Sequence, residues 1–182
     1  MSGSLAGHHL VAAPTLLDPN FYRTVVYIVE HGEDGALGLV LNRRTTEPVA
    51  DHLPDWAEWV TAPDEVFIGG PVANEVAVGI AELPEVPPEG WDPALPGIGL
   101  IDLSAGPEAI GRVARLRVFS GYSGWVTGQL EMEVQTDSWF IVPAHPDDIF
   151  TTDPEQLRAV VLKRQPGRLA MYAHYPDDPT VN

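Results

Sequence analysis

The chain has 182 residues, of which 45% are hydrophobic and 20% charged, and these proportions indicate a globular protein and exclude wholesale disorder. Its formal net charge of −16 disfavours binding to nucleic-acid phosphates and to anionic membranes, since both are negatively charged. The absence of cysteine excludes disulfides, thiolate nucleophiles and cysteine metal sites within this sequence.

The first third of the chain is rich in predicted strands. Residues 9–13 form a short apolar run that Pro14 ends. Residues 25–29 are continuously apolar and mostly β-branched, which is typical of a strand covered on both faces. The glycine-containing loop 31–35 joins this run to residues 37–42, and together they predict an antiparallel hairpin. Apolar residues at helical spacing predict a helix over 46–59, kinked at Pro54.

The middle of the chain alternates short apolar runs with turns. Residues 66–68, 75–83 and 98–103 are predicted strands. Between them, residues 84–97 are rich in proline and acidic residues, which predicts a surface loop, with a lid as the alternative. Proline at the tolerated first helical position predicts a helix over 106–114.

The stretch Ser120–Val134 combines glycines, aromatics, an amide and two carboxylates. A strand over 116–119 leads into it, and Val126, Leu130 and Val134 then recur at helical spacing. We therefore predict a helix from about Gly124, capped by Ser123, with those three side chains in the core. Gly128 within such a helix indicates a close backbone neighbour.

The last part of the chain predicts a strand over 138–142, a helical turn after His145 and a helix that begins near Asp153. Hairpins dominate and strict βαβ alternation is absent. We therefore expect an α+β protein with a largely antiparallel sheet, a single domain over 1–182, and frayed ends at 1–6 and 176–182.

The catalytic and metal motifs that we sought are incomplete. Residues 121–125 approach a nucleophile elbow around Ser123, but its final glycine is replaced by Trp125. No phosphate-binding loop and no known metal-ligand spacing is present, so we expect no cofactor and no metal. Glu131 and Glu133 diverge on a helix and make a poor carboxylate pair. We predict no catalytic residue, and we expect the scattered arginines to pair with the surplus carboxylates.

An ordered set of motifs resembles the YqgE/AlgH family of bacterial proteins. The motifs are Ser4-Leu5-x-Gly7-His8, Asp18-Pro19-x-Phe21, Glu30-His31, Gly35–Arg43, Gly69–Val72 and Gly121-Tyr122-x-Gly124-Trp125-x-x-Gly128-Gln129-Leu130-Glu131-x-Glu133. The resemblance implies an α+β fold with a bifurcated, partly barrel-like antiparallel sheet flanked by helices, in a cytosolic bacterial protein. It brings no established activity. Some members carry the label of a transcriptional regulator through an association with alginate production.

Two functional hypotheses follow from these residues. The first is a non-enzymatic regulatory or binding module that acts through an unknown protein or small-molecule partner rather than through direct contact with nucleic acid or membrane. The second is a hydrolase or transferase that uses a cleft near His31, Asn42, Tyr122 and Glu131. The candidate binding residues are His31, Asn42, Tyr122, Trp125, Gln129 and Glu131.

Overall fold

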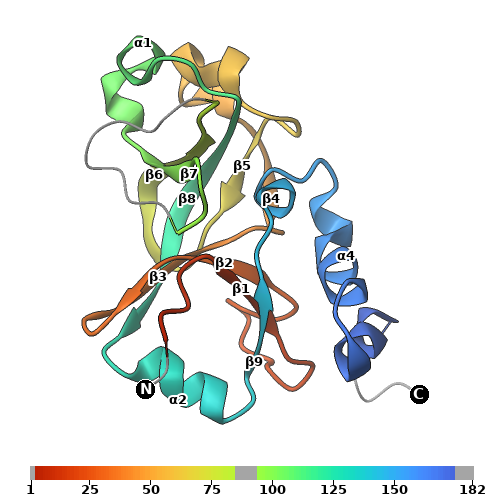
Figure 1. Ribbon diagram of the computed structural model, residues 1–182. Helices are drawn as coiled ribbons and strands as arrows, with labels where there is room; N and C mark the ends of the chain where they lie inside the picture. Colours follow the sequence, from red (N-terminus) through yellow and green to blue (C-terminus); the bar gives the residue numbers. More distant parts are fainter. Residues whose placement is uncertain (1–2, 85–93, 175–182) are drawn as a thin grey trace.

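The computed structural model describes residues 3–84 and 94–174, so most of the predicted 84–97 loop and the tail after Tyr175 lie outside the described residues (Figure 1). The strands are β1 His8–Ala12, β2 Val25–Gly32, β3 Gly35–Val40, β4 Arg44–Pro48, β5 Glu65–Ile68, β6 Val72–Glu82, β7 Ile98–Ile101, β8 Arg115–Val126 and β9 Trp139–Pro143. The α-helices are α1 Pro107–Ile110, α2 Gln129–Gln135, α3 Pro146–Ile149 and α4 Leu157–Lys163. The 3₁₀ helices are η1 Val49–Asp51, η2 Pro54–Trp59, η3 Leu103–Ala105, η4 Pro154–Gln156 and η5 Gly167–His174.

One mixed sheet contains all nine strands, in the order β4-β5-β8-β3-β2-β1-β9, with β6 and β7 branching from β8. The long strand β8 creates the branch. Its first part pairs with β6, its middle pairs in parallel with β5, and its last four residues pair with β3. In Figure 1, β8 runs from the part of the molecule that holds α1 to the part that holds α2.

The expected α+β class, with a bifurcated and mostly antiparallel sheet flanked by helices, is confirmed. The barrel-like part of the expectation is corrected, because the sheet is not closed. Within the described chain, β4, β7 and β9 each pair with a single neighbour, so the sheet has open edges.

Strand β2 shows why the hairpin prediction succeeded. Its residues 25–28 are at most 2% exposed, and alternate side chains enter two different cores. Val26 and Ile28 pack with α2, whereas Val25 and Tyr27 face the core that includes α4. A strand buried on both faces must be continuously apolar, and residues 25–29 have this pattern. The paired strand β3 follows after the turn at Glu33 and Asp34.

Two helix predictions are wrong in part. Residues 44–48 form the edge strand β4, and only the short helices η1 and η2 occupy the rest of 46–59. The helix predicted from Gly124 begins at Gln129, because β8 continues to Val126. Val126 is consequently 72% exposed rather than buried, although Leu130 does lie in the core.

Two details of that turn also differ from the prediction. The hydroxyl of buried Ser123 donates to the carbonyl of Gly69 at 3.0 Å instead of capping a helix. Gly128 is the N-terminal cap of α2, with a φ of +75° and open space around its Cα, so conformation and not a close neighbour explains this glycine. The helix predicted over 106–114 is the single turn α1.

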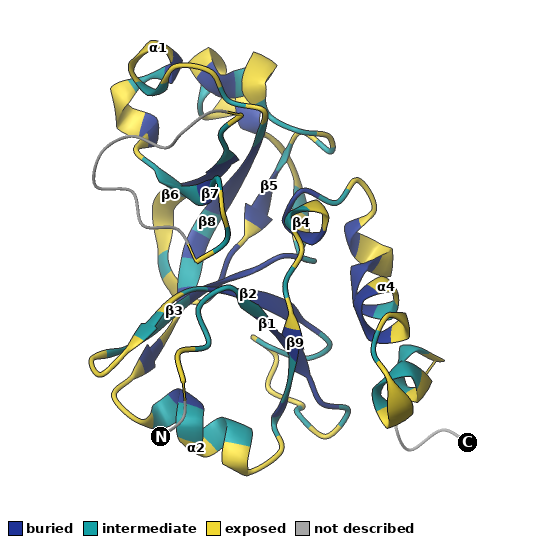
Figure 2. Cartoon of the chain, in the orientation of Figure 1, coloured by how far each residue is buried: buried dark blue, intermediate teal, exposed yellow. Residues whose placement is uncertain are grey.

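The described residues form three apolar cores, and Figure 2 shows their buried strands against the exposed outer faces of the helices. One core lies between the sheet and helices α3 and α4, and it includes Val11, Tyr27, Leu39, Phe119, Ile149 and Val161. A second lies beneath α2 and includes Leu10, Val26, Ile28, Trp125, Leu130 and Trp139. The third lies beneath η1 and η2 and includes Val49, Trp56, Val66, Leu116 and Val118.

Candidate functional site

The turn from β8 into α2 is held by one carboxylate. Oε2 of Glu133 accepts the indole N–H of Trp125 at 2.8 Å and that of Trp139 at 2.9 Å, while Oε1 accepts the Gln129 amide at 3.1 Å. Phe21 stacks on Trp125 and meets Trp139 edge-on. These bonds join β8, α2 and β9, which follow one another in the chain, and Phe21 adds a segment that is distant in the sequence. Trp125 and Gln129 therefore help to hold α2 on the sheet.

His31 joins the N-terminal segment to α2. Its Nδ1 accepts the backbone N–H of Leu5 at 2.9 Å, and its Nε2 lies 2.7 Å from Oε1 of Glu131. These bonds define a neutral ring with the proton on Nε2, donated to the carboxylate. A hydrogen bond within Glu131 itself, followed by the bond from His31, lowers the pKa of Glu131. The hydroxyl of Ser4 also donates to the His31 carbonyl, so part of the segment 1–6 is tied to β2.

Asn42 and Tyr122 lie apart from this pair. The Asn42 side chain donates to the carbonyl of Arg23 and accepts from the N–H of Val25, at the opposite end of β2 from His31. Val25 and His31 are six positions apart along β2, which corresponds to about 20 Å in a strand. Tyr122 of β8 pairs with Val72 of β6, and its side chain packs against the core that includes α4. The four residues of the predicted catalytic cleft are therefore not brought to one place.

A hollow of about 430 Å³ lies beside His31. It is bounded by the hairpin of β2 and β3, including Glu30, Glu33 and Asp34, and by Trp125. The hollow is thus acidic and formed largely by one hairpin. Both ring nitrogens of His31 are engaged elsewhere, so the histidine presents no free base to this space.

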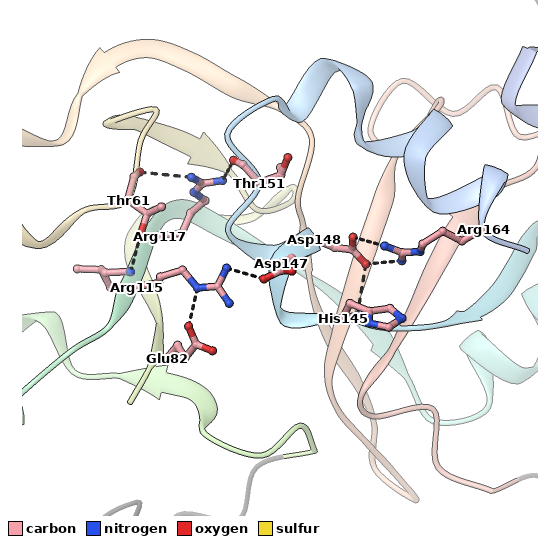
Figure 3. A network of polar contacts seen from close by, with 10 residues as sticks. Thr61, Glu82, Arg115, Arg117, His145, Asp147, Asp148, Thr151 and Arg164 are labelled. Carbon is pink, nitrogen blue, oxygen red and sulfur yellow. Dashed lines mark hydrogen bonds and ion pairs between the residues drawn. The ribbon is translucent and has the colours of Figure 1, made fainter. Parts of the chain in front are cut away.

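The sequence did not indicate a buried ionic cluster at His9. Nε2 of His9 donates to Oδ2 of Asp148 at 3.0 Å. Arg164 binds both carboxylate oxygens of Asp148 at 2.7 and 2.6 Å (Figure 3). Burial lowers the pKa of His9. Burial alone would raise the pKa of Asp148, but the bonds from Arg164 and His9 hold that pKa well below its usual range. Only the tertiary fold brings these residues together, although the capping pattern at His145 marked the position of Asp148.

Two arginines of β8 belong to the same polar region. Figure 3 shows Arg115 between Glu82 and Asp147, and Arg117 between Thr61 and Thr151. Arg115 bridges Glu82 at 2.5 Å and Asp147 at 2.9 Å. Arg117 is fully buried, and it donates to the carbonyls of Thr151, Thr61 and Ala62. Its guanidinium also lies 4.4 Å from the ring centre of Phe67, and burial lowers its pKa to about 10. These cations are paired with groups of the same chain. Arg44 with Glu155, and Arg164 with Asp148, also form ion pairs within the chain.

A groove of about 280 Å³ crosses the face of the sheet between β4 and β6; we call it the β6 groove. Its floor is formed by Val66, Val118 and Ser120, and one wall is formed by His52 and Leu53. The opposite wall is the exposed segment 74–77 of β6, and Glu47 lies at the rim. The groove combines an apolar floor with several polar groups, and sequence patterns did not indicate it.

No group of three or more histidine, aspartate or glutamate side chains is placed to hold a metal ion in the part of the chain that is described. No helix of that part has the length and apolar character needed to cross a membrane.

The geometry defines an α+β protein with an open, branched sheet, and comparison with known proteins gives its family. The AlgH-like family model matches residues 9–170. A UPF0301 protein of Streptomyces coelicolor is 48% identical over 98% of this chain and 96% of its own length. A UPF0301 protein of Mycobacterium tuberculosis is 41% identical over 95% of this chain and 88% of its own.

Solved structures agree with this result. The crystal structure of a Corynebacterium diphtheriae protein has a TM-score of 0.83 at 31% identity, covering 95% of this chain and 93% of that one. The solution structure of the AlgH protein of Pseudomonas aeruginosa has a TM-score of 0.71 at 28% identity, covering 97% of both. The chain therefore belongs to the AlgH-like family, and the resemblance seen in the sequence is confirmed. The names of these relatives specify no activity.

Proposed function

We propose that this chain is a non-enzymatic binding module of the bacterial cytoplasm, with a regulatory role exerted through a bound protein or small ligand. The β6 groove is the observation that carries the proposal. It joins an apolar floor at Val66 and Val118 to polar groups at its rim, as ligand sites commonly do. The polar residues of the α2 turn, in contrast, are occupied in holding the fold together.

The alternative, a hydrolase or transferase, is favoured by one observation. The His31–Glu131 pair has the form of an oriented base, and it lies beside a hollow of about 430 Å³. Two features weigh against this alternative. Nδ1 of His31 accepts from Leu5, and the other proposed residues, Asn42 and Tyr122, lie elsewhere.

A capture experiment tests the proposal. The immobilised full chain is exposed to bacterial cytosol, and retained proteins and small molecules are identified by mass spectrometry. Val76→Lys places a charged side chain in the groove wall, and Val160→Lys is a matched control on α4, because Val76 and Val160 are 46% and 47% exposed. We expect a ligand that the wild type and Val160→Lys retain and that Val76→Lys loses. Equal retention by all three proteins, or retention by none, would reject the proposal.

A further inference from the structure

We infer that the β6 groove binds an extended peptide segment of a protein partner, with an apolar side chain on the groove floor and a lysine or arginine beside it. The inference rests on the proposed function and specifies the ligand of the same site. Its basis is the size of the groove, the unpaired backbone along one wall and the charge at the rim.

The dimensions of the groove favour a side chain over a cofactor. Its volume of about 280 Å³ lies just below the ~300–1,000 Å³ typical of small-molecule pockets. The floor residues Val66 and Val118 are themselves almost fully buried, so an apolar group placed there contacts the outer surface of a packed core. A smaller hollow of about 110 Å³ shares Asn74 and extends the surface to the exposed side chain of Ile68. An elongated ligand with more than one anchoring group fits this shape.

The wall of the groove offers backbone groups to an extended chain. The pairing of β6 with β8 shifts register between Val72 and Ala77, so residues 73–76 have no strand partner among the described residues. On its other edge, β6 pairs with β7 only over 79–82. Within this segment Ala73 has a φ of +50° and the carbonyl of Asn74 already accepts from the Ser120 hydroxyl, so Glu75 and Val76 are the residues whose backbone is offered to a ligand. An exposed strand segment without a partner is the feature that β-strand addition uses, with backbone hydrogen bonds giving affinity.

The charge at the rim selects the class of peptide. Glu47 is exposed and bonds with His52 at 3.0 Å, and exposed Glu75 projects from the opposite wall. The chain as a whole carries a formal net charge of −16. A lysine or arginine in the ligand is therefore complementary, whereas an acidic peptide is repelled. An apolar residue next to a basic one matches the arrangement of floor and rim.

Titration of the ¹⁵N-labelled full chain with synthetic peptides tests the inference. The probe is acetyl-Ser-Lys-Leu-Lys-Val-Lys-Ser-amide. One control peptide replaces each lysine by glutamate, and a second replaces the leucine and valine by serine. We expect saturable chemical-shift changes in residues 66, 74–77 and 118–120 with the first peptide, and no comparable saturation with either control.

Variants separate specific docking from general attraction to an acidic protein. Val76→Lys is expected to weaken binding about tenfold, as loss of an interface anchor does. Glu75→Gln is expected to weaken it about threefold, in keeping with an exposed ion pair, and Val160→Lys is expected to leave it unchanged. The inference is overturned if the serine-substituted or the acidic peptide binds as well as the probe, or if the changes lie outside the groove.

These experiments distinguish failure of the peptide class from failure of the proposed function. If the wild type retains a cytosolic ligand that Val76→Lys loses, but the probe leaves the groove residues unshifted, the proposed function stands and the peptide class is rejected. If neither the cytosolic ligand nor the probe depends on Val76, both are rejected.

Discussion

At the scale of single residues, the carboxylate of Glu133 supplies the acceptor for two indole N–H donors that would otherwise be unsatisfied. The indole N–H groups of Trp125 and Trp139 both donate to its Oε2, and both rings are buried. A buried donor without an acceptor costs about 1–3 kcal/mol. Glu133 therefore stabilises the fold mainly because, without its carboxylate, these two buried N–H groups would lose their acceptor.

We predict that Glu133→Ala lowers the free energy of unfolding by about 2–4 kcal/mol, because two buried donors lose their acceptor. Glu133→Gln should lower it by less, since its amide oxygen still accepts. Urea unfolding followed by tryptophan fluorescence measures the effect. Glu30→Ala, at an exposed position of β2, is the control and should be close to neutral. A Glu133→Ala protein as stable as wild type would contradict this account.

The buried pair of His9 and Asp148 makes stability depend on pH. The lowered pKa of His9 means that the unfolded chain binds a proton below about pH 6.5 that the folded protein does not yet bind. Stability is therefore full above pH 6.5 and falls as the pH drops, by up to about 1.4 kcal/mol per unit for this one group. The lowered pKa of Asp148 adds a second loss below about pH 4.

We accordingly predict that the free energy of unfolding decreases steadily from about pH 6.5 to pH 5. His9→Gln should flatten this part of the curve, whereas His52→Gln should not, because His52 is exposed. Urea titrations at half-unit pH intervals give the comparison. Identical slopes for the two variants would show that His9 is not the responsible group.

At the scale of elements, the branch in the sheet depends on backbones that approach one another closely. Gly121 has a φ of +70°, and a Cβ at this position would lie 2.6 Å from the carbonyl oxygen of Val72 and 2.9 Å from that of Gly70. Gly121 lies between Ser120 and Tyr122, where the pairing of β8 with β6 shifts register, and the pairing with β3 begins at Ser123. A side chain would therefore be strained both by conformation and by contact with backbone that cannot move aside.

We predict that Gly121→Ala lowers the free energy of unfolding by about 2 kcal/mol or more. Gly124→Ala, three residues along the same strand, is the matched control. Its added Cβ would meet its nearest neighbours at ordinary distances of 3.7 and 3.8 Å. Thermal unfolding gives the melting temperatures of the two variants, and we expect the lower value for Gly121→Ala. Equal melting temperatures would refute the role of close backbone approach at Gly121.

At the scale of the whole molecule, the charge distribution determines which partners can approach. Acidic residues exceed basic ones by 26 to 10. Arg115, Arg117 and Arg164 are engaged in ion pairs or buried hydrogen bonds and are not free to form a nucleic-acid surface. Arg43 donates to the carbonyls of Asn20 and Tyr22. The remaining surface carries an acidic excess.

We therefore predict no retention of the full chain on immobilised duplex DNA even at low salt, about 50 mM, where phosphate contacts are strongest. A basic DNA-binding protein on the same resin serves as the positive control. Retention that weakens steeply with added salt would contradict the prediction and favour a direct regulatory contact with DNA.

The sequence by itself determined those features whose cause is local. The hairpin of β2 and β3 is recognisable because a strand buried on both faces must be continuously apolar and because its turn requires glycine. The helical turn at His145 is recognisable from its capping residues. The ordered motifs likewise sufficed for the family.

Only the tertiary structure decided the features that depend on distant partners. The spacing of Val126, Leu130 and Val134 fits a helix, but Val126 pairs with Gly35 in the sheet, and a local period contains no information about that partner. The same holds for His9 with Asp148, which are far apart in the sequence. Glu133 is close in sequence to Trp125 and Trp139, but its bonds to them depend on how α2 packs against β8 and β9. The β6 groove depends on a register shift between two strands, which is a property of their pairing and of neither strand alone.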